Sequence, residues 1–331
     1  MAKFKILTSI PEAFAPYLQL MFDTLKERDC EVIDTWFAEG LPRKELLALV
    51  PTLDGAVIGL DRIDREVMKA GLPKFKVVSK FGVGVDNFDL VAANELGFVV
   101  CNVPGANSDA VADFTIAMML AVARQIIASG AEVRRGGYRA QVGPQLGGRT
   151  LGIIGLGNIG TRVALRAKYG FEMRVIANDI VERPDFAITH RIEYLPKDEI
   201  YRQADFVSVH TGLTPLTRGM IGARELKLMK RSAYLINNAR GGIVDEDALY
   251  EALSNGQIAG AAIDVFAKEP PVGSKLLTLE NVVVSAHTAG SSPEAVSKIG
   301  ITAAHNLLRV LHGQKPIYTV TPDSCAALAD A

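Results

Sequence analysis

The second half of the chain places three ionisable side chains directly after short apolar runs. Arg240 lies in INNARGGI, Glu269 in DVFAKEP and His287 in SAHTAG. A histidine exchanges protons near neutral pH, and a carboxylate can orient its ring and favour its charged form. An arginine can bind a carboxylate through charge-assisted hydrogen bonds and polarise an adjacent keto oxygen. Together these residue types fit the transfer of a hydride and a proton to a 2-keto acid.

Each of the three also has a purely structural interpretation. Arg240 fits a structural ion pair, His287 a loop histidine in a chain with five histidines, and Glu269 a solvated residue before a proline. Ligands of open parallel sheets bind outside the carboxyl ends of the strands, however, and all three residues follow predicted strands. Their joint placement therefore predicts one catalytic group of Arg240, Glu269 and His287.

A glycine pattern indicates what would supply the hydride. Residues 151–160 read LGIIGLGNIG, which puts Gly155, Gly157 and Gly160 at the positions of G-x-G-x-x-G. These glycines allow a tight turn, a close approach to a pyrophosphate and close helix packing. Asp179 follows at the end of the next apolar run, where a carboxylate accepts ribose hydroxyls and repels a 2′-phosphate. The pattern predicts NAD, and the alternative is a strand–helix turn that binds nothing.

Short apolar runs alternate with helical patterns, which predicts βαβ units and parallel sheets. Helices are expected at Ala13–Glu27, Arg43–Val50, Ser108–Arg135 and Pro293–Leu311. The apolar centre of the helix at Ser108–Arg135 suits either a position between two domains or contact with a partner subunit. Strands are expected at Phe4–Thr8, Val32–Thr35, Ala56–Ile58, Val77–Phe81, Val99–Cys101, Leu151–Ile154, Arg174–Asn178, Phe206–Val209, Ala233–Asn237, Ala259–Asp264 and Val282–Ala286.

The predicted fold class is α/β, with two Rossmann-like, doubly wound parallel-sheet domains and a cofactor cleft between them. The substrate domain is expected to be discontinuous, comprising residues 1–103 and 292–331. Residues 104–291 are expected to form the NAD-binding domain, because they contain the glycine pattern.

The segment KFGVGVDN, residues 80–87, follows a predicted strand of the first domain. Successive N–H groups at Gly82, Val83 and Gly84 can form a nest for a substrate carboxylate. Lys80 would add positive charge for an anionic substrate. The alternative is a glycine turn needed only for its backbone angles.

Composition excludes several other classes. The net charge is −1 and the sequence has no block of basic residues, so it lacks the positive charge that would attract nucleic acid or an anionic membrane. No apolar run reaches the ~18 residues of a membrane span, and the N-terminus lacks a signal-peptide pattern. The three scattered cysteines imply neither a disulfide framework nor a metal site. We therefore expect a cytoplasmic protein that binds a small anionic acid.

The motifs together resemble the D-isomer-specific 2-hydroxyacid dehydrogenase family, most closely its phosphoglycerate dehydrogenase branch. The resemblance is densest in GVGVDNFD, NVPGANSDAVADFT, GIIGLGNIG, VHTGLTPLTRGMIG, NNARGGIVDEDAL, AGAAIDVFAKEP and SAHTAG. It implies an NAD-dependent enzyme, a homodimer formed through the cofactor domain, and the catalytic group above, with Val83 near the nicotinamide. It implies cofactor contacts from Asn158, Ile159, Asp179, Thr211, Asn238, Ala239, Arg240, Asp264 and the segment His287–Gly290, beside the glycines Gly155, Gly157 and Gly160.

Two departures concern the substrate. Phosphoglycerate dehydrogenases often carry arginine where Lys80 stands, and the two residues recognise phosphate differently. Many also carry C-terminal regulatory domains, whereas this chain stops soon after Tyr318. The leading expectation is 3-phosphoglycerate, which would place the enzyme in serine biosynthesis. The alternatives are a reductase of glyoxylate, hydroxypyruvate or another small 2-keto acid, and an NAD-sensing protein of the corepressor type.

Overall fold

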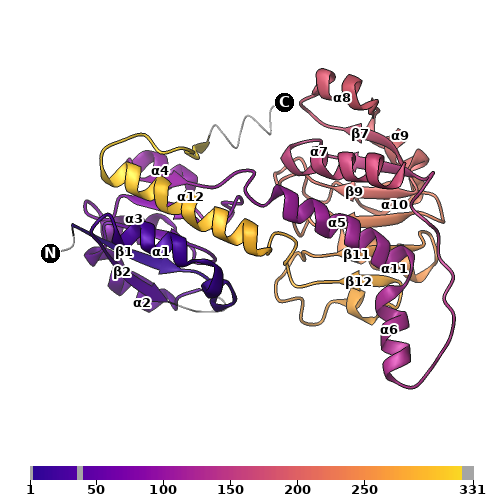
Figure 1. The fold of residues 1–331 in the computed structure, drawn as a ribbon, viewed down its shortest axis with the longest axis horizontal. Coiled ribbons are helices and arrows are strands. Elements are labelled where there is room, and N and C mark those ends of the chain that lie inside the picture. The colour runs from indigo at the N-terminus through magenta and orange to yellow at the C-terminus, as the bar shows by residue number, and fades with distance from the viewer. Residues whose placement is uncertain (1–2, 36–39, 323–331) are drawn as a thin grey trace. The chain divides into compact units, whose positions relative to one another are not determined.

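The computed structural model describes residues 3–35 and 40–322. The chain divides into two compact units (Figure 1). The first comprises Met1–Asn107 and Ser291–Asp330, and the second comprises Ser108–Gly290. Both units are α/β structures with one parallel sheet each, which confirms the predicted fold class.

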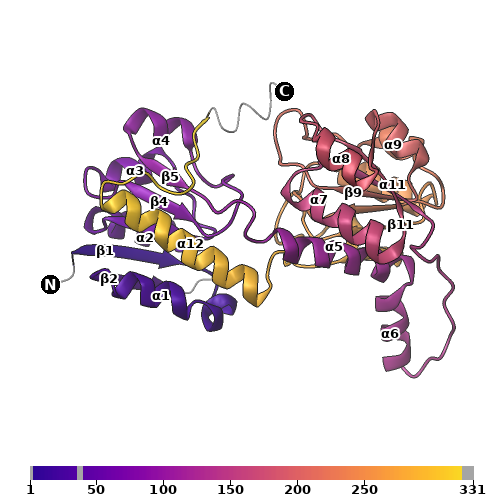
Figure 2. The ribbon, with the colours of Figure 1, turned by 45° about the horizontal axis from the view of Figure 1, so that its top comes forward.

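The first unit has a five-stranded parallel sheet in the order β2-β1-β3-β4-β5. Helix α12 returns from the far end of the sequence and packs beside α1 over this sheet, as Figures 1 and 2 both show. The elements are β1 (Phe4–Ser9), η1 (Glu12–Tyr17), α1 (Gln19–Lys26), β2 (Cys30–Thr35), α2 (Arg43–Leu49), η2 (Val50–Thr52), β3 (Gly55–Ile58), α3 (Arg65–Gly71), β4 (Val77–Lys80), α4 (Leu90–Leu96), β5 (Val99–Cys101) and α12 (Pro293–Leu311).

Helices cover both faces of this sheet, so its strands β1, β3 and β4 are buried with little alternation, whereas the edge strand β2 is partly exposed. In β1, Ile6 packs into one hydrophobic cluster with Leu307 of α12, while the next residue, Leu7, packs into the opposite cluster with Val67 of α3. Successive strand residues point to opposite faces, and here both faces are core. This burial fixes the sheet, and with it the loops at the carboxyl ends of its strands.

The second unit has a seven-stranded parallel sheet in the order β12-β11-β10-β9-β6-β7-β8. The strand order reverses between β6 and β9, the kind of position where α/β sheets bind ligands. The elements are α5 (Ser108–Ala123), α6 (Ile126–Arg134), β6 (Thr150–Ile154), α7 (Asn158–Leu165), η3 (Arg166–Gly170), β7 (Arg174–Asn178), α8 (Pro184–His190), β8 (Glu193–Tyr194), α9 (Lys197–Gln203), β9 (Phe206–Val209), α10 (Ala223–Leu228), β10 (Tyr234–Asn237), α11 (Glu246–Ser254), β11 (Gly260–Ile263), η4 (Lys275–Thr278) and β12 (Val282–Val284).

The predicted strands are present, but two predicted helices are wrong in extent. The stretch Ser108–Arg135 forms α5 and α6, whose axes bend by 62° where Gln125 adopts a left-handed φ of +50°. No glycine or proline marks this break, so periodicity could not predict it. The stretch Ala13–Glu27 begins as the 3₁₀ helix η1, which contains Pro16, and only then continues as α1. Proline lacks the N–H that a continuous α-helix needs.

The prediction also missed strand β8, which has only two residues and pairs with β7. Among the described helices, no single one is long and apolar enough to cross a membrane, although α5 and the bent α6 meet that test as a pair. Nine of the sixteen residues of α5 are buried against α7 and the sheet of the second unit. The apolar centre of α5 is therefore core.

Candidate active site

The predicted glycine turn connects β6 to α7. Gly155 has a φ of +97°, which favours glycine, and a Cβ at Gly160 would overlap the carbonyl of Gly155. Gly157 is the N-cap of α7, where no side chain caps the helix and no atom lies within 4 Å of the place where a Cβ would stand. The free N–H groups at this helix start thus face an open cradle of the kind that holds phosphate.

Asp179 follows β7 and is bound to the same turn. One carboxylate oxygen accepts a hydrogen bond from the N–H of Leu156 (2.5 Å), and the other accepts one from the N–H of Val181 (3.0 Å). The half-buried carboxylate is therefore held beside the glycine turn in a fixed orientation. This is the placement expected of an acid that accepts ribose hydroxyls.

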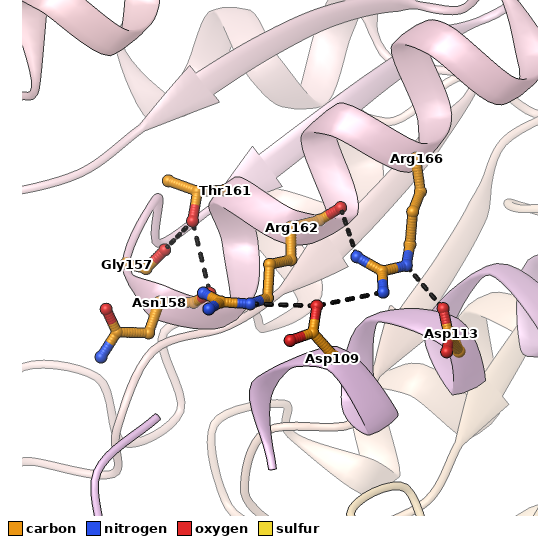
Figure 3. Close-up of polar contacts among 7 residues, drawn as sticks. All are labelled: Asp109, Asp113, Gly157, Asn158, Thr161, Arg162 and Arg166. Carbon is orange, nitrogen blue, oxygen red and sulfur yellow. Dashed lines mark hydrogen bonds and ion pairs between the residues drawn. The ribbon is translucent and has the colours of Figure 1, made fainter. Parts of the chain in front are cut away.

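Ion pairs connect the start of α5 to α7 and to the first residue of η3 (Figure 3). Asp109 contacts Arg162 (3.1 Å) and Arg166 (3.2 Å), and Asp113 contacts Arg166 (2.6 Å). Partial burial raises the pKa of Asp109, but hydrogen bonds from both arginines outweigh burial and hold this pKa below its usual range. Both carboxylates are largely exposed, so each pair contributes little by itself. The network joins the first helix of the unit to the helix whose first residue, Asn158, borders the cradle.

Two polar atoms lack partners near the carboxyl ends of β9 and β10. Thr211 Oγ1 and Asn238 Oδ1 are buried and have no hydrogen-bond partner in the part of the chain that the structure describes. The amide nitrogen of Asn238 donates to Thr115 Oγ1 (3.2 Å), which sets the orientation of its free oxygen. Buried polar atoms are normally satisfied, so these two atoms fit partners supplied by a ligand. With the cradle and Asp179, they fit a bound dinucleotide.

His287 and Glu269 form a direct pair. His287 Nδ1 lies 2.9 Å from Glu269 Oε2, while Glu269 Oε1 accepts a hydrogen bond from the N–H of Phe266 (3.0 Å). Burial raises the pKa of Glu269, but hydrogen bonds from His287 and Phe266, with the charge of Arg240, bring this pKa below its usual value. Glu269 therefore stays ionised near neutral pH. Because Nδ1 is occupied, Nε2 is the imidazole nitrogen left to meet a substrate.

The loop that carries His287 is held by a buried carboxylate. His287 has a positive φ of +52°, and its N–H donates to the carbonyl of Asp264 (2.8 Å). The Asp264 side chain, 1% exposed, accepts bonds from Ser285 Oγ (2.6 Å) and from the N–H groups of Thr288 and Ala289 (2.9 Å each). Asp264, predicted as a cofactor contact, thus fixes the segment up to Gly290 in this structure.

Arg240 lies in the loop after β10. The side-chain amide of Asn237 donates to the main-chain carbonyl of Arg240 (3.0 Å), and the Arg240 guanidinium donates to the carbonyl of Ala239 (2.8 Å). A Cβ at Gly241 would overlap the Phe266 carbonyl, so only a glycine lets this loop pack against the loop that leads to Glu269. The structure therefore brings Arg240, Glu269 and His287 to one edge of the sheet.

The first unit contains the other predicted site residues. Lys80 Nζ donates to the carbonyl of Gly59 and to Asn87 Oδ1 (2.9 Å), so it connects the loops after β3 and β4. Gly82 has a positive φ of +139°. Its carbonyl and that of Val83 accept hydrogen bonds from residues 102–103, as described below.

Sequence reasoning missed several residues that hold these loops. Asn102 and Asn306 support the loop after β4, Asn87 binds Lys80, and Thr115 orients Asn238. Asn306 alone left a signal, because it is a polar residue within the buried stripe of α12. The Lys80–Asn87 bond lies within one loop, seven positions apart, while the Asn102–Val83 and Asn238–Thr115 bonds join residues 19 and 123 positions apart. No local pattern predicts these bonds.

Comparison with known proteins identifies the family. Residues 116–289, more than half of the chain, match the family model described as "D-isomer specific 2-hydroxyacid dehydrogenase, NAD binding domain". The chain belongs to the D-isomer-specific 2-hydroxyacid dehydrogenase family. It is an NAD-dependent oxidoreductase that acts on CH–OH groups.

Relatives of this dehydrogenase are named for different substrates. A glyoxylate reductase of Korarchaeum cryptofilum is 41% identical over 293 residues, covering 86% of this chain and 88% of that protein. A D-3-phosphoglycerate dehydrogenase of Methanocaldococcus jannaschii is also 41% identical, over 288 residues, and covers 86% of this chain but only 55% of that protein. The dehydrogenase thus spans about half the length of that second relative.

Solved structures agree with the fold. The TT0316 protein of Thermus thermophilus superimposes with a TM-score of 0.86 at 38% identity, covering 96% of this chain and 100% of that chain. A D-isomer-specific 2-hydroxyacid dehydrogenase of Lactobacillus delbrueckii ssp. bulgaricus, in an NAD complex, superimposes with a TM-score of 0.75 at 26% identity, with 96% and 100% covered.

Proposed function

We propose that this dehydrogenase interconverts a short 2-hydroxy acid and its 2-keto acid through Arg240, Glu269 and His287. Bound NADH supplies the hydride in the reductive direction. Arg240 binds the substrate carboxylate and polarises the keto oxygen. In the first unit, the N–H groups of the Gly82–Gly84 loop provide a nest for a substrate carboxylate. The observation that carries this proposal is the pairing of His287 Nδ1 with Glu269 Oε2 at 2.9 Å.

The proton moves between His287 Nε2 and the substrate oxygen. During reduction, the protonated imidazole donates this proton to the forming alkoxide and becomes neutral. During oxidation, the neutral imidazole accepts the hydroxyl proton. Glu269 keeps the ring oriented in both directions, and its lowered pKa keeps it ionised while the ring changes charge. Asp264 contributes by holding the loop on which His287 lies.

The surroundings of Lys80 favour a substrate without phosphate. A phosphate group adds about −1.5 to −2 charges at neutral pH, and binding it calls for several available cations. Lys80 already donates to the carbonyl of Gly59 and to Asn87 Oδ1, which engage two of the three donors of its ammonium group. We therefore infer that glyoxylate, hydroxypyruvate or a similar small 2-keto acid is the substrate. 3-Phosphoglycerate is the second candidate, because the relative with that name is equally identical at 41%.

A substrate panel tests this choice. The initial rate of NADH oxidation should be measured with glyoxylate, hydroxypyruvate, pyruvate and phosphohydroxypyruvate at matched concentrations. We expect kcat/KM for glyoxylate or hydroxypyruvate to exceed that for phosphohydroxypyruvate by at least about tenfold, the equivalent of one misplaced charge contact. The opposite order would reject the small-acid assignment and favour 3-phosphoglycerate, with the catalytic roles unchanged.

We further propose that the dehydrogenase is a homodimer joined through the second unit. Helix α6 and the segment after it extend from the body of this unit in both views (Figures 1 and 2). They expose the apolar side chains of Ile127 (61%), Val133 (54%), Tyr138 (97%) and Val142 (90%). So many exposed apolar side chains on one projecting segment indicate an interaction surface. A second copy of the chain is the partner that the family resemblance implies.

Two negative charges introduced into this segment should prevent dimer formation. We expect the double variant Y138D/V142D to lose the dimer, because two buried unpaired carboxylates oppose association. Sedimentation velocity at micromolar concentration should show twice the chain mass for the natural protein and the single chain mass for the variant. Ile188→Asp, which changes an exposed residue of α8 in the same unit (77%), is the control and should remain dimeric. A natural protein of single mass would reject the dimer.

A further inference from the structure

The loop Gly82–Gly84 is oriented by hydrogen bonds to its carbonyl oxygens. The carbonyl of Gly82 accepts from the N–H of Val103 (2.9 Å), and the carbonyl of Val83 accepts from the side-chain amide of Asn102 (2.8 Å). In a trans peptide, the N–H points opposite to the carbonyl of the preceding residue. The N–H groups of Val83 and Gly84 are therefore directed away from residues 102–103.

The main chain of Asn102 is bound by Asn306, a buried residue of α12. The side-chain amide of Asn306 donates to the carbonyl of Asn102 (3.0 Å). Asn306 is 0% exposed, and its oxygen accepts from the N–H groups of Ile317 (2.9 Å) and Tyr318 (3.1 Å). An amide in a hydrophobic core is costly unless it is hydrogen-bonded, and this one has partners on both sides.

These bonds form one continuous series. It runs from residues 317–318 through Asn306 to the main chain of Asn102, and from the side chain of Asn102 to the carbonyl of Val83. Every member lies in the first unit, and Asn306 is 204 positions away from Asn102 in the sequence. Removal of the Asn102 amide would leave the Val83 carbonyl without its donor and free this peptide to rotate.

We propose that Asn102 is a positioning residue for the substrate carboxylate, and that Asn306 fixes Asn102. This inference rests on the proposed function, in which the N–H groups of this loop bind the carboxylate. Asn102 acts through the loop: its side-chain amide holds the Val83 carbonyl and so sets the direction of the Gly84 N–H. Small displacements of a positioning group reduce productive binding strongly, so the effect should fall on the substrate side of the reaction.

Two variants of Asn102 distinguish positioning from space filling. Asn102→Ala removes the donor, whereas Asn102→Asp keeps the shape but presents an oxygen to the Val83 carbonyl. The readouts are KM for the best keto acid, the inhibition constant of oxamate (an unreactive isostere of a 2-keto acid), and the dissociation constant of NADH. We expect oxamate inhibition to weaken about tenfold in Asn102→Ala and further in Asn102→Asp, with NADH binding changed less than about threefold.

Asn306 supplies a second test of the series. Asn306→Asp keeps the oxygen that accepts from residues 317–318, replaces the donor to Asn102 with a second oxygen, and adds an acid at a buried position. We expect it to weaken oxamate inhibition, and to add little when it is combined with Asn102→Ala, because residues in one network are not additive. Additive effects would show that the two residues act separately and would overturn the series.

Asn281→Ala is the matched control. This half-buried amide of the second unit bonds the carbonyls of Leu253 and Ala259 (3.4 Å each), so its loss should lower the melting temperature without altering oxamate inhibition. All assays should be run well below the lowest melting temperature among these variants, so that only folded protein is compared. An oxamate inhibition constant in Asn102→Asp equal to that of the unchanged enzyme would overturn the positioning role. An unchanged enzyme that neither reduces a keto acid nor binds oxamate would overturn the proposed function itself.

Discussion

Replacing His287 with alanine should lower kcat for keto-acid reduction by about 10²–10⁴-fold, the usual contribution of a general acid–base residue. The structure supplies the reason, because Glu269 occupies Nδ1 at 2.9 Å and leaves Nε2 for the substrate oxygen. Without the ring, the forming alkoxide must take its proton from water. The affinity for NADH should change little, since the glycine turn and Asp179 are untouched. Stopped-flow measurement of hydride transfer and titration of NADH fluorescence separate the two effects.

His305 offers a control for this substitution. It is an exposed histidine of α12, and His305→Ala should keep natural turnover. Turnover of His287→Ala within twofold of the natural enzyme would remove His287 from the mechanism. Glu269→Gln tests the orienting role separately: it keeps a hydrogen-bonding oxygen but loses the charge. It should therefore lower kcat less than His287→Ala does.

Replacing Asp179 with serine should weaken NADH binding by about 10- to 100-fold, the range expected for losing hydrogen bonds to a charged acceptor. Two effects combine, because the carboxylate would bind the ribose hydroxyls and also holds the N–H groups of Leu156 and Val181. The same change should relax discrimination against NADPH, since the charge that repels a 2′-phosphate is gone. Dissociation constants of both cofactors, measured by fluorescence, give the ratio directly.

Asp179→Asn separates charge from loop support. The asparagine oxygen can still accept from one N–H of the glycine turn, so this variant should gain NADPH affinity while losing less NADH affinity than serine does. Asp185→Ser, at an exposed acid in the first turn of α8, is the control and should leave both constants unchanged. If the NADH-to-NADPH ratio of Asp179→Ser equals that of the natural protein, another group selects the cofactor.

The elements that sequence patterns predicted well are those with local causes. An apolar run between turn residues becomes a buried parallel strand almost wherever it lies, so every strand except the two-residue β8 was predictable. The helix break at Gln125 was not, because a residue with ordinary helix propensity adopts a left-handed conformation there. Tertiary context can override local preference at such a position.

The same division runs through the candidate site. The amino-acid sequence by itself determined the glycine turn, the acid after β7 and the three ionisable residues after β10, β11 and β12. Residue type and position at a strand end can both be recognised in a short stretch of sequence. Only the tertiary structure decided that His287 pairs with Glu269, that Asp264 holds their loop and that Asn306 supports Asn102 across 204 positions. Those contacts depend on which strands and helices become neighbours. Hydrogen bonds act over about 3 Å in space, with no regard to separation along the chain.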